Sequence, residues 1–363
     1  MKTLWARLGL TLAILTLLAA GAAPTEAATR KYTQVAAGGE HACAITSRGD
    51  AYCWGSNADG QLGNGNKSNT PSLTAVAVVG GYRFTSIAAS KYTTCAITSR
   101  GNAYCWGADD NSDGYSTSGG MLGGGFALGD SDAPVAVLGG RRFTSISAGT
   151  DHFCGLTSDG RAHCWGGNSS GQLGDGTTDD KDQPVAVSGN VRFVSITTAH
   201  AYTCGITQRG VFCWGQAFSS TPTMVPGGRG IVRLEATETE LCGITQPGRL
   251  MCLDNEVLTA VVGAPKYADL AVGSGEVYSL CGVQKNGVVY CWDDNAGTPT
   301  TPDKLDTDLR FTSVTQGGLN LPENVQFSCG LTKAGAAYCW GSNGGGQLGN
   351  GTQTSTEVPQ TVQ

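Results

Sequence analysis

The chain of 363 residues is acidic, with 29 Asp and Glu residues against 23 Lys and Arg residues and a net charge of −6. This balance argues against nucleic acid as a partner, because nucleic-acid binding needs clustered Lys and Arg residues. Only 14% of residues are charged, 55 are Gly and 40% are hydrophobic, which excludes a disordered linker and favours a folded domain with many tight turns.

The first 28 residues are predicted to be a secretory signal peptide. Lys2 and Arg7 begin it, residues 8–20 form an apolar run that is short for a membrane span, and small residues follow. We expect cleavage between about residues 22 and 28. Loss of Lys2 and Arg7 takes the net charge from −6 to −8. The mature protein is therefore expected to be secreted or periplasmic, monomeric and without a membrane anchor; an uncleaved anchor is the alternative.

The stretch from Cys43 to Gly55, CAITSRGDAYCWG, recurs seven times with different degrees of change. Two β-forming runs flank a turn that contains Gly, which predicts a tight β-hairpin. Symmetry about Arg48 places Cys43 opposite Cys53. Directly opposed residues share a face of the sheet and lie close enough for a disulfide.

The same register pairs all 14 cysteines within their own hairpins. The predicted bridges are Cys43–Cys53, Cys95–Cys105, Cys154–Cys164, Cys204–Cys213, Cys242–Cys252, Cys281–Cys291 and Cys329–Cys339. In the fourth hairpin the cysteines are one residue closer, so its turn must be one residue shorter. Structural zinc, the alternative, needs closely spaced pairs such as C-x-x-C, and the chain contains none. Disulfides persist in oxidising compartments, which agrees with export.

A longer repeat surrounds each hairpin. RFTSIAAS precedes the second hairpin at 83–90, and GSNADGQLGNG follows the first at 55–65, before a further short strand. Four strands in a unit of about 48 residues are typical of a β-propeller. We therefore predict one all-β domain over residues 29–363, a seven-bladed propeller of four-stranded blades. The Trp of CWG, such as Trp54, is expected in the core between blades, and Leu62 of GQLG is expected to pin its loop.

These motifs together resemble the regulator-of-chromosome-condensation repeat family over nearly the whole mature chain, most specifically in units one, two, three and seven. The family fold is a seven-bladed propeller, in agreement with the repeat count. The paired cysteines with CWG are also similar to the extracellular repeats of CRINKLY-type plant receptor kinases. The resemblance implies one alternative function, guanine-nucleotide exchange on a small nuclear GTPase as in the founding member, a partner that a secreted protein would not meet. The GWRHT motif of the family's plant photoreceptor corresponds here to GGEHA at 38–42, which argues against photoreception.

Propeller geometry predicts where a partner binds. In four antiparallel strands A to D, the A–B and C–D loops emerge on one face and the tight B–C turns on the other. The longest C–D loop follows Gly107 in unit two, and the longest A–B loop, at 317–327, is in unit seven. Both units border unit one in a closed ring, so the two insertions are expected to flank its loops.

Long loops with apolar tips on a rigid scaffold are typical recognition elements. The predicted partner-binding residues in these insertions are Tyr115, Met121, Leu122, Phe126, Leu319 and Leu321. The expected partner is an unidentified extracellular protein. A tolerated insertion without function is the alternative.

The unit-two insertion also contains a possible calcium ligand set. Asp109, Asn111 and Asp113 follow the D-x-N-x-D-G start of calcium loops, but the twelfth position is Gly120 where such loops carry Glu. Calcium is therefore a hypothesis beside the alternative of a solvated turn, and no other cofactor is predicted.

Catalytic motifs are missing from the sequence. It contains no HExxH, and His41 is expected to pack inside a blade on the face of Cys43. Scattered acidic residues leave an extracellular carbohydrate-active or other enzyme as an alternative. The main prediction is a secreted protein-binding scaffold that recognises its partner through the loop-rich propeller face and is not an enzyme.

Overall fold

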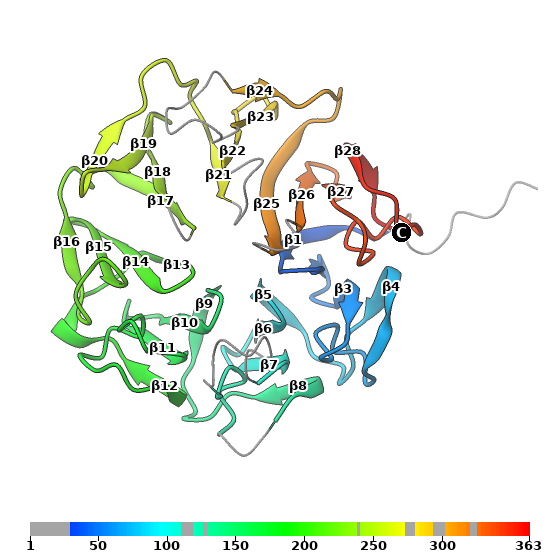
Figure 1. The fold of residues 1–363 in the computed structure, drawn as a ribbon, viewed down its shortest axis with the longest axis horizontal. Coiled ribbons are helices and arrows are strands. Elements are labelled where there is room, and N and C mark those ends of the chain that lie inside the picture. Colours follow the sequence, from blue (N-terminus) through cyan, green and yellow to red (C-terminus); the bar gives the residue numbers. More distant parts are fainter. Residues whose placement is uncertain are drawn as a thin grey trace, which may run out of the picture.

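The computed structural model describes residues 30–109, 119–125, 129–237, 240–272, 280–292, 302–319 and 325–363. Their 28 strands form seven four-stranded antiparallel sheets. The sheets stand around a central axis like the blades of a closed ring (Figure 1). The predicted seven-bladed propeller is therefore confirmed. Within the described ranges, no helix is long and apolar enough to cross a membrane.

Each blade is one contiguous segment whose strands follow chain order from the inner strand A to the outer strand D. Blades 1 to 3 consist of β1 (Tyr32–Ala37), β2 (His41–Thr46), β3 (Ala51–Asn57), β4 (Ser68–Ala77), β5 (Phe84–Ala89), β6 (Thr93–Thr98), β7 (Ala103–Gly107), β8 (Ser131–Ala136), β9 (Phe143–Ala148), β10 (His152–Thr157), β11 (Ala162–Gly166) and β12 (Lys181–Ala186). Blades 4 and 5 consist of β13 (Ser195–Thr198), β14 (Tyr202–Thr207), β15 (Gly210–Gly215), β16 (Thr223–Val225), β17 (Ile231–Ala236), β18 (Leu241–Thr245), β19 (Leu250–Asp254) and β20 (Val257–Ala260). Blades 6 and 7 consist of β21 (Asp269–Val272), β22 (Leu280–Val283), β23 (Val289–Trp292), β24 (Asp303–Lys304), β25 (Phe311–Leu319), β26 (Val325–Thr332), β27 (Ala337–Gly341) and β28 (Thr356–Thr361).

The first and last blades meet without sharing a strand. Tyr32 N–H donates to Gly335 O at 2.8 Å, just as Phe84 N–H donates to Gly49 O at 2.8 Å between blades 1 and 2. On the outer side, Ala75 N–H donates to Gln363 O at 2.9 Å. The ring therefore closes by the same kind of contact that joins its other blades.

The hairpin register agrees with the sequence prediction. Cys43 lies opposite Cys53, and all seven predicted disulfides are present, with Cα–Cα distances of 4.0–4.1 Å. The bridge of blade 4 spans nine residues where the others span ten, and Thr207 pairs with Gly210 across the shorter turn. Among the described residues no cysteine is free.

Candidate functional site

The seam between two blades, by which we mean the interface where their sheets pack, is built around Trp and the Gly-rich C–D loop. Between blades 1 and 2, Trp106 is fully buried and its Nε1 donates to Gln61 O at 3.0 Å. Leu62 is also buried, and its N–H donates to Asn57 Oδ1 at 3.2 Å, so Leu62 pins the loop as predicted. The same bond recurs in three further seams, from Trp165 to Met121 O, from Trp214 to Gln172 O and from Trp54 to Gln347 O.

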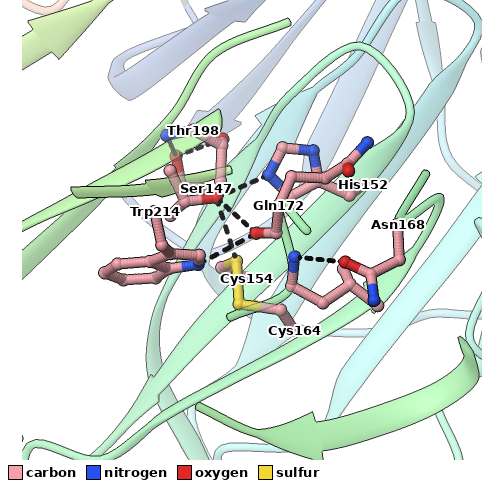
Figure 2. Close-up of a disulfide and its surroundings, with 10 residues drawn as sticks. Ser147, His152, Cys154, Cys164, Asn168, Gln172, Thr198 and Trp214 are labelled. Atoms are coloured by element: carbon pink, nitrogen blue, oxygen red, sulfur yellow. Dashed lines mark hydrogen bonds between the residues drawn. A yellow bond between two sulfur atoms is a disulfide. The ribbon is translucent and has the colours of Figure 1, made fainter. Parts of the chain in front are cut away.

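Two of these seams also enclose a histidine. His152 Nε2 lies 2.7 Å from Thr203 Oγ1, and that hydroxyl donates to Gln172 O at 2.9 Å; Figure 2 shows His152 and Gln172 beside the Cys154–Cys164 disulfide. Because the hydroxyl proton goes to Gln172 O, the hydroxyl oxygen accepts from His152 Nε2–H.

Burial explains why this histidine stays neutral. His152 is completely buried, and this burial lowers its pKa to about 3. His41 repeats the arrangement with Thr94 at 2.8 Å, and burial lowers its pKa to about 3 as well. His41 is thus buried, as predicted, but it lies in a seam and not inside one blade. Both histidines have a structural role in these contacts.

The prediction that Met121 and Leu122 bind a partner is wrong. Met121 is 1% exposed and Leu122 is fully buried. Gly120 to Gly123, read as GMLG, stand where GQLG stands in blade 1, so Leu122 replaces Leu62 and the Met121 carbonyl accepts the Trp165 indole N–H. They belong to the seam between blades 2 and 3 and offer no surface to a partner.

The other predicted binding residues lie in or beside the two insertions. Tyr115, Phe126 and Leu321 lie outside the described residues. Leu319 ends β25, and its backbone lies opposite that of Val325. These four residues stay predictions.

Asp109 takes the structural role that Asn57 has in blade 1. It is 4% exposed, and its Oδ1 accepts the Leu122 N–H at 2.9 Å. Asn111 and Asp113, the other predicted calcium ligands, lie outside the described residues. Within the part of the chain that the structure describes, no three His, Cys, Asp or Glu residues are grouped to hold a metal ion. The carboxylate of Asp109 is therefore engaged in holding its loop, and calcium stays a hypothesis.

The loops of blade 1 lie between the two insertions. On one side β25 has nine residues where β1 has six, and Gly318 N–H donates to Gly38 O at 2.9 Å, in the A–B turn of blade 1. On the other side Lys67, in the C–D loop of blade 1, lies 2.9 Å from Asp130, which follows the unit-two insertion. We call this side of the ring, with its A–B and C–D loops, the loop face. The described ends of both insertions thus meet the blade-1 loops on it, as the sequence predicted.

The central channel contains charged residues that the sequence analysis missed. It has a volume of about 450 Å³ and is lined by the inner strands of all seven blades. Arg233 of β17 lies 2.5 Å from Asp269 of β21 (Nε to Oδ1) and 3.4 Å from Glu235 (Nη2 to Oε1). Asp269 Oδ2 also accepts the Val314 N–H of β25 at 3.3 Å. This ion-pair cluster therefore ties together the inner strands of blades 5, 6 and 7.

Enclosure changes the acidity of the two carboxylates. Although 29% of the Glu235 side chain is exposed, it faces the enclosed channel, and burial raises its pKa to about 7 while Arg233 opposes the shift. Burial also raises the pKa of Asp269, again against Arg233. A sequence signal existed: Arg233 and Asp269 both occupy the repeat position of Ser86, which is uncharged in the other five units.

Comparison with known proteins identifies the repeat. Residues 32–61, 84–114 and 143–172, and also 48–97, 159–206 and 334–363, match the regulator of chromosome condensation (RCC1) repeat. The ultraviolet-B receptor UVR8 of Arabidopsis thaliana is 33% identical over 153 residues, which cover 41% of this chain and 33% of the receptor. The human E3 ubiquitin-protein ligase HERC2 is 31% identical over 159 residues, which cover 41% of this chain and 3% of the ligase. The matched segments thus span a third or less of these relatives.

Solved structures show the same fold across more of the chain. The CRINKLY WD40 ectodomain of the Arabidopsis thaliana receptor kinase ACR4 aligns with a TM-score of 0.56 at 17% identity, covering 92% of this chain and 99% of the ectodomain. Yeast RCC1 (Prp20), in a structure bound to Kap60, aligns with a TM-score of 0.54 at 20% identity, covering 92% of this chain and 75% of that one. At these identities the likeness concerns the fold alone.

Proposed function

Because the chain belongs to the RCC1 repeat family and folds as its propeller, a protein-interaction scaffold, we propose that it is a secreted binding protein that recognises a protein partner through its loop face. The observation that carries the proposal is the meeting of two insertions around blade 1. Gly318 of the blade-7 hairpin bonds to Gly38 on one side, and Asp130 bonds to Lys67 on the other. Each insertion is therefore held at one described end beside the loops of blade 1.

The scaffold under these loops is rigid, which favours binding. Seven disulfides cross-link the B and C strands, and the C–D loops of blades 1, 3 and 7 are pinned by Asn57, Asn168 and Asn343. Loops whose ends are already fixed lose less conformational entropy on binding a partner. Recognition residues are commonly placed on loops that such a scaffold positions.

The disulfides also support the proposed compartment. Seven intra-chain bridges persist only where thiols are not continually reduced, as outside the cell or in a periplasm. The ACR4 propeller, which has the same fold, is an ectodomain of a receptor kinase. Export of this chain would place it in a comparable environment.

Affinity capture from the extracellular medium of the source would test the proposal. The bait is the chain from residue 29, compared with a variant in which residues 110–118 are replaced by a short Gly-Ser turn. This replacement keeps Asp109 and Leu122, which the seam needs. The matched control replaces residues 293–301, a segment of equal length between strands C and D of blade 6.

We expect one captured protein to be lost with the 110–118 replacement and kept with the 293–301 replacement. All three baits should show the same melting temperature. Equal capture by the three baits, or capture by none, would contradict the proposed site beside blade 1.

A further inference from the structure

The charges of this acidic chain are segregated between its two faces. Of its 23 Lys and Arg residues, Lys2 and Arg7 precede residue 29, which leaves 21. Seven of these, one per blade, lie in the B–C turns: Arg48, Arg100, Arg161, Arg209, Arg249, Lys285 and Lys333. Seven more, again one per blade, lie one to three residues before the inner strand: Lys31, Arg83, Arg142, Arg192, Arg229, Lys266 and Arg310. All fourteen are exposed, and we call the side that carries them the basic face.

Backbone contacts show that the two sets lie side by side. The residue after Arg83, Phe84, donates its N–H to Gly49 O in the turn that carries Arg48. Equivalent bonds join five other seams. Between blades 4 and 5, the backbone nitrogen of Arg229 lies close to Gly210, 3.6 Å from the position that a Cβ on this glycine would take. Every seam therefore places a Lys or Arg of a B–C turn beside a Lys or Arg that precedes an inner strand. Arg30 and Arg141 add to the same face.

Few acidic residues balance these cations. The B–C turns and the linkers before the inner strands contain four, Asp50, Asp159, Asp306 and Asp308. Asp50 pairs with Arg83, and Asp159 with Arg192 at 2.8 Å. Among the described residues, Arg100, Arg209 and Arg249 make no ion pair. The basic face is thus strongly positive although the chain as a whole carries −6.

We propose that the basic face docks the propeller onto a bilayer that contains anionic phospholipids. Equivalent positions in seven blades lie at one level along the propeller axis, so the cations form a flat ring, and a membrane surface is a flat sheet of negative charge. A linear polyanion would contact only part of such a ring. Each Lys or Arg near an anionic surface adds favourable binding energy, so many weak contacts suffice for attachment.

The chain also enters the propeller from this side. Arg30, the first described residue, precedes β1 on the basic face, so residues 1–29 join the ring there. The predicted apolar run at 8–20 is part of that segment. If residues 1–29 cross a membrane during export, the propeller emerges attached to it on the side of the basic face, so this face points toward the lipid. The loop face would then point away from the bilayer, free for the proposed protein partner.

Vesicle co-sedimentation tests the proposal with the chain from residue 29, so that the apolar run takes no part. We expect binding to phosphatidylcholine vesicles with roughly 30% phosphatidylglycerol and none to pure phosphatidylcholine. Binding at about 0.05 M salt should be lost at about 0.5 M salt, because exposed charges are screened. The triple variant Arg100→Glu, Arg209→Glu and Arg249→Glu should lower the partition coefficient at least about 100-fold, since three cations near the surface are removed.

A matched control changes the same charge on the loop face, with Lys67→Glu, Lys91→Glu and Lys181→Glu. This control should keep most of the binding, and both variants should keep the melting temperature within a few degrees of the parent. Absence of binding to anionic vesicles, or an equal loss in the control, would overturn the proposal. Tighter binding to a short DNA duplex than to the vesicles at equal salt would also overturn it, because the partner would then be a soluble polyanion. The outcome is independent of the capture experiment on the loop face.

Discussion

The two halves of the ring join their blades by different chemistry. From blade 7 through blades 1, 2, 3 and 4, each seam contains a Trp whose indole N–H bonds to a loop carbonyl of the preceding blade. From blade 4 through blade 7, Leu253 replaces one Trp, and among the described residues neither Trp292 nor Trp340 makes that bond. Within this second half, the ion-pair cluster of Arg233, Glu235 and Asp269 ties the inner strands of blades 5, 6 and 7. Where the repeat motif has degraded, the seam thus depends on different contacts nearer the axis.

Removal of a seam Trp should have the largest effect. Trp106→Ala leaves a cavity and an unpaired carbonyl at Gln61, and we expect the free energy of unfolding to fall by about 3–5 kcal/mol. Trp292→Ala should cost less, because no indole hydrogen bond is lost among the described residues. Chemical denaturation of both variants measures the difference. An equal cost would show that the loop carbonyl bond contributes nothing to the contrast between the halves.

Acidification should affect the two halves in opposite directions. The pKa values of His41 and His152 are lowered to about 3 in the folded state, so the unfolded chain binds more protons below about pH 6.5 and stability falls as the pH falls. At pH 5 each histidine should cost about 2 kcal/mol relative to pH 7. The pKa of Glu235 is raised to about 7, so the folded chain binds more protons between about pH 4.5 and 7, and this group adds stability as the pH falls.

Hydrogen exchange at pH 5 and pH 7 can follow this contrast blade by blade. We expect faster opening of strands around His41 and His152 at pH 5, and no such loss around Glu235. The variant Glu235→Gln should remove the stabilising response of blade 5 alone. A uniform response of all seven blades to pH would contradict the assignment.

The ion-pair cluster itself should have a moderate effect. Arg233→Ala leaves the Asp269 carboxylate, whose side chain is 5% exposed, without its cation, and we expect a loss of about 2 kcal/mol. Asp269→Asn keeps an acceptor for Val314 N–H and should cost about 1 kcal/mol. The double variant should cost less than the sum, and a double-mutant cycle by thermal unfolding checks this. Strict additivity would show that the pair does not couple the blades.

The smallest expected effect concerns the shortened C–D loop of blade 5. Asp254 lies opposite Val257, and the two turn residues between them, Asn255 and Glu256, have φ values of 47° and 66°. Gly adopts such values without steric cost, so Glu256→Gly should raise the free energy of unfolding by about 0.5–1 kcal/mol. Glu256→Ala should bring no such gain, and a gain from Ala equal to that from Gly would exclude backbone strain as the cause.

The fold was predictable because the cysteines constrain the hairpin register. Cys43 can face Cys53 in only one alignment of its hairpin, and the repeat of that alignment gave the disulfides and the blades. Met121 and Leu122 were misassigned because GMLG differs from GQLG by the residue whose carbonyl, not its side chain, makes the seam bond. Any residue type can supply this backbone carbonyl, so a sequence motif cannot show the contact.

The channel cluster and the basic face escaped prediction for another reason. Arg233 and Asp269 are 36 positions apart, and each alone looks like an exposed charge in a strand. Their contact depends on two inner strands standing side by side around the axis. The basic face was hidden because a net charge of −6 sums two opposite surfaces into one number. Both features follow from the topology of the ring and from no single stretch of sequence.

Closure of the ring without a shared strand makes the chain suitable for circular permutation. Val362 N–H bonds to Ala337 O as Val78 N–H bonds to Ala51 O, and Gln363 N–H bonds to Gly349 O as Val79 N–H bonds to Gly63 O. Gln363 therefore stands where Val79 stands, and Arg30 stands where Tyr82 stands. A Gly-Gly dipeptide between them would reproduce the linker from blade 1 to blade 2, and new chain ends could then be opened in any other linker. The seven blades thus follow one another in a cycle, and the chain could begin and end at another linker without a change of fold.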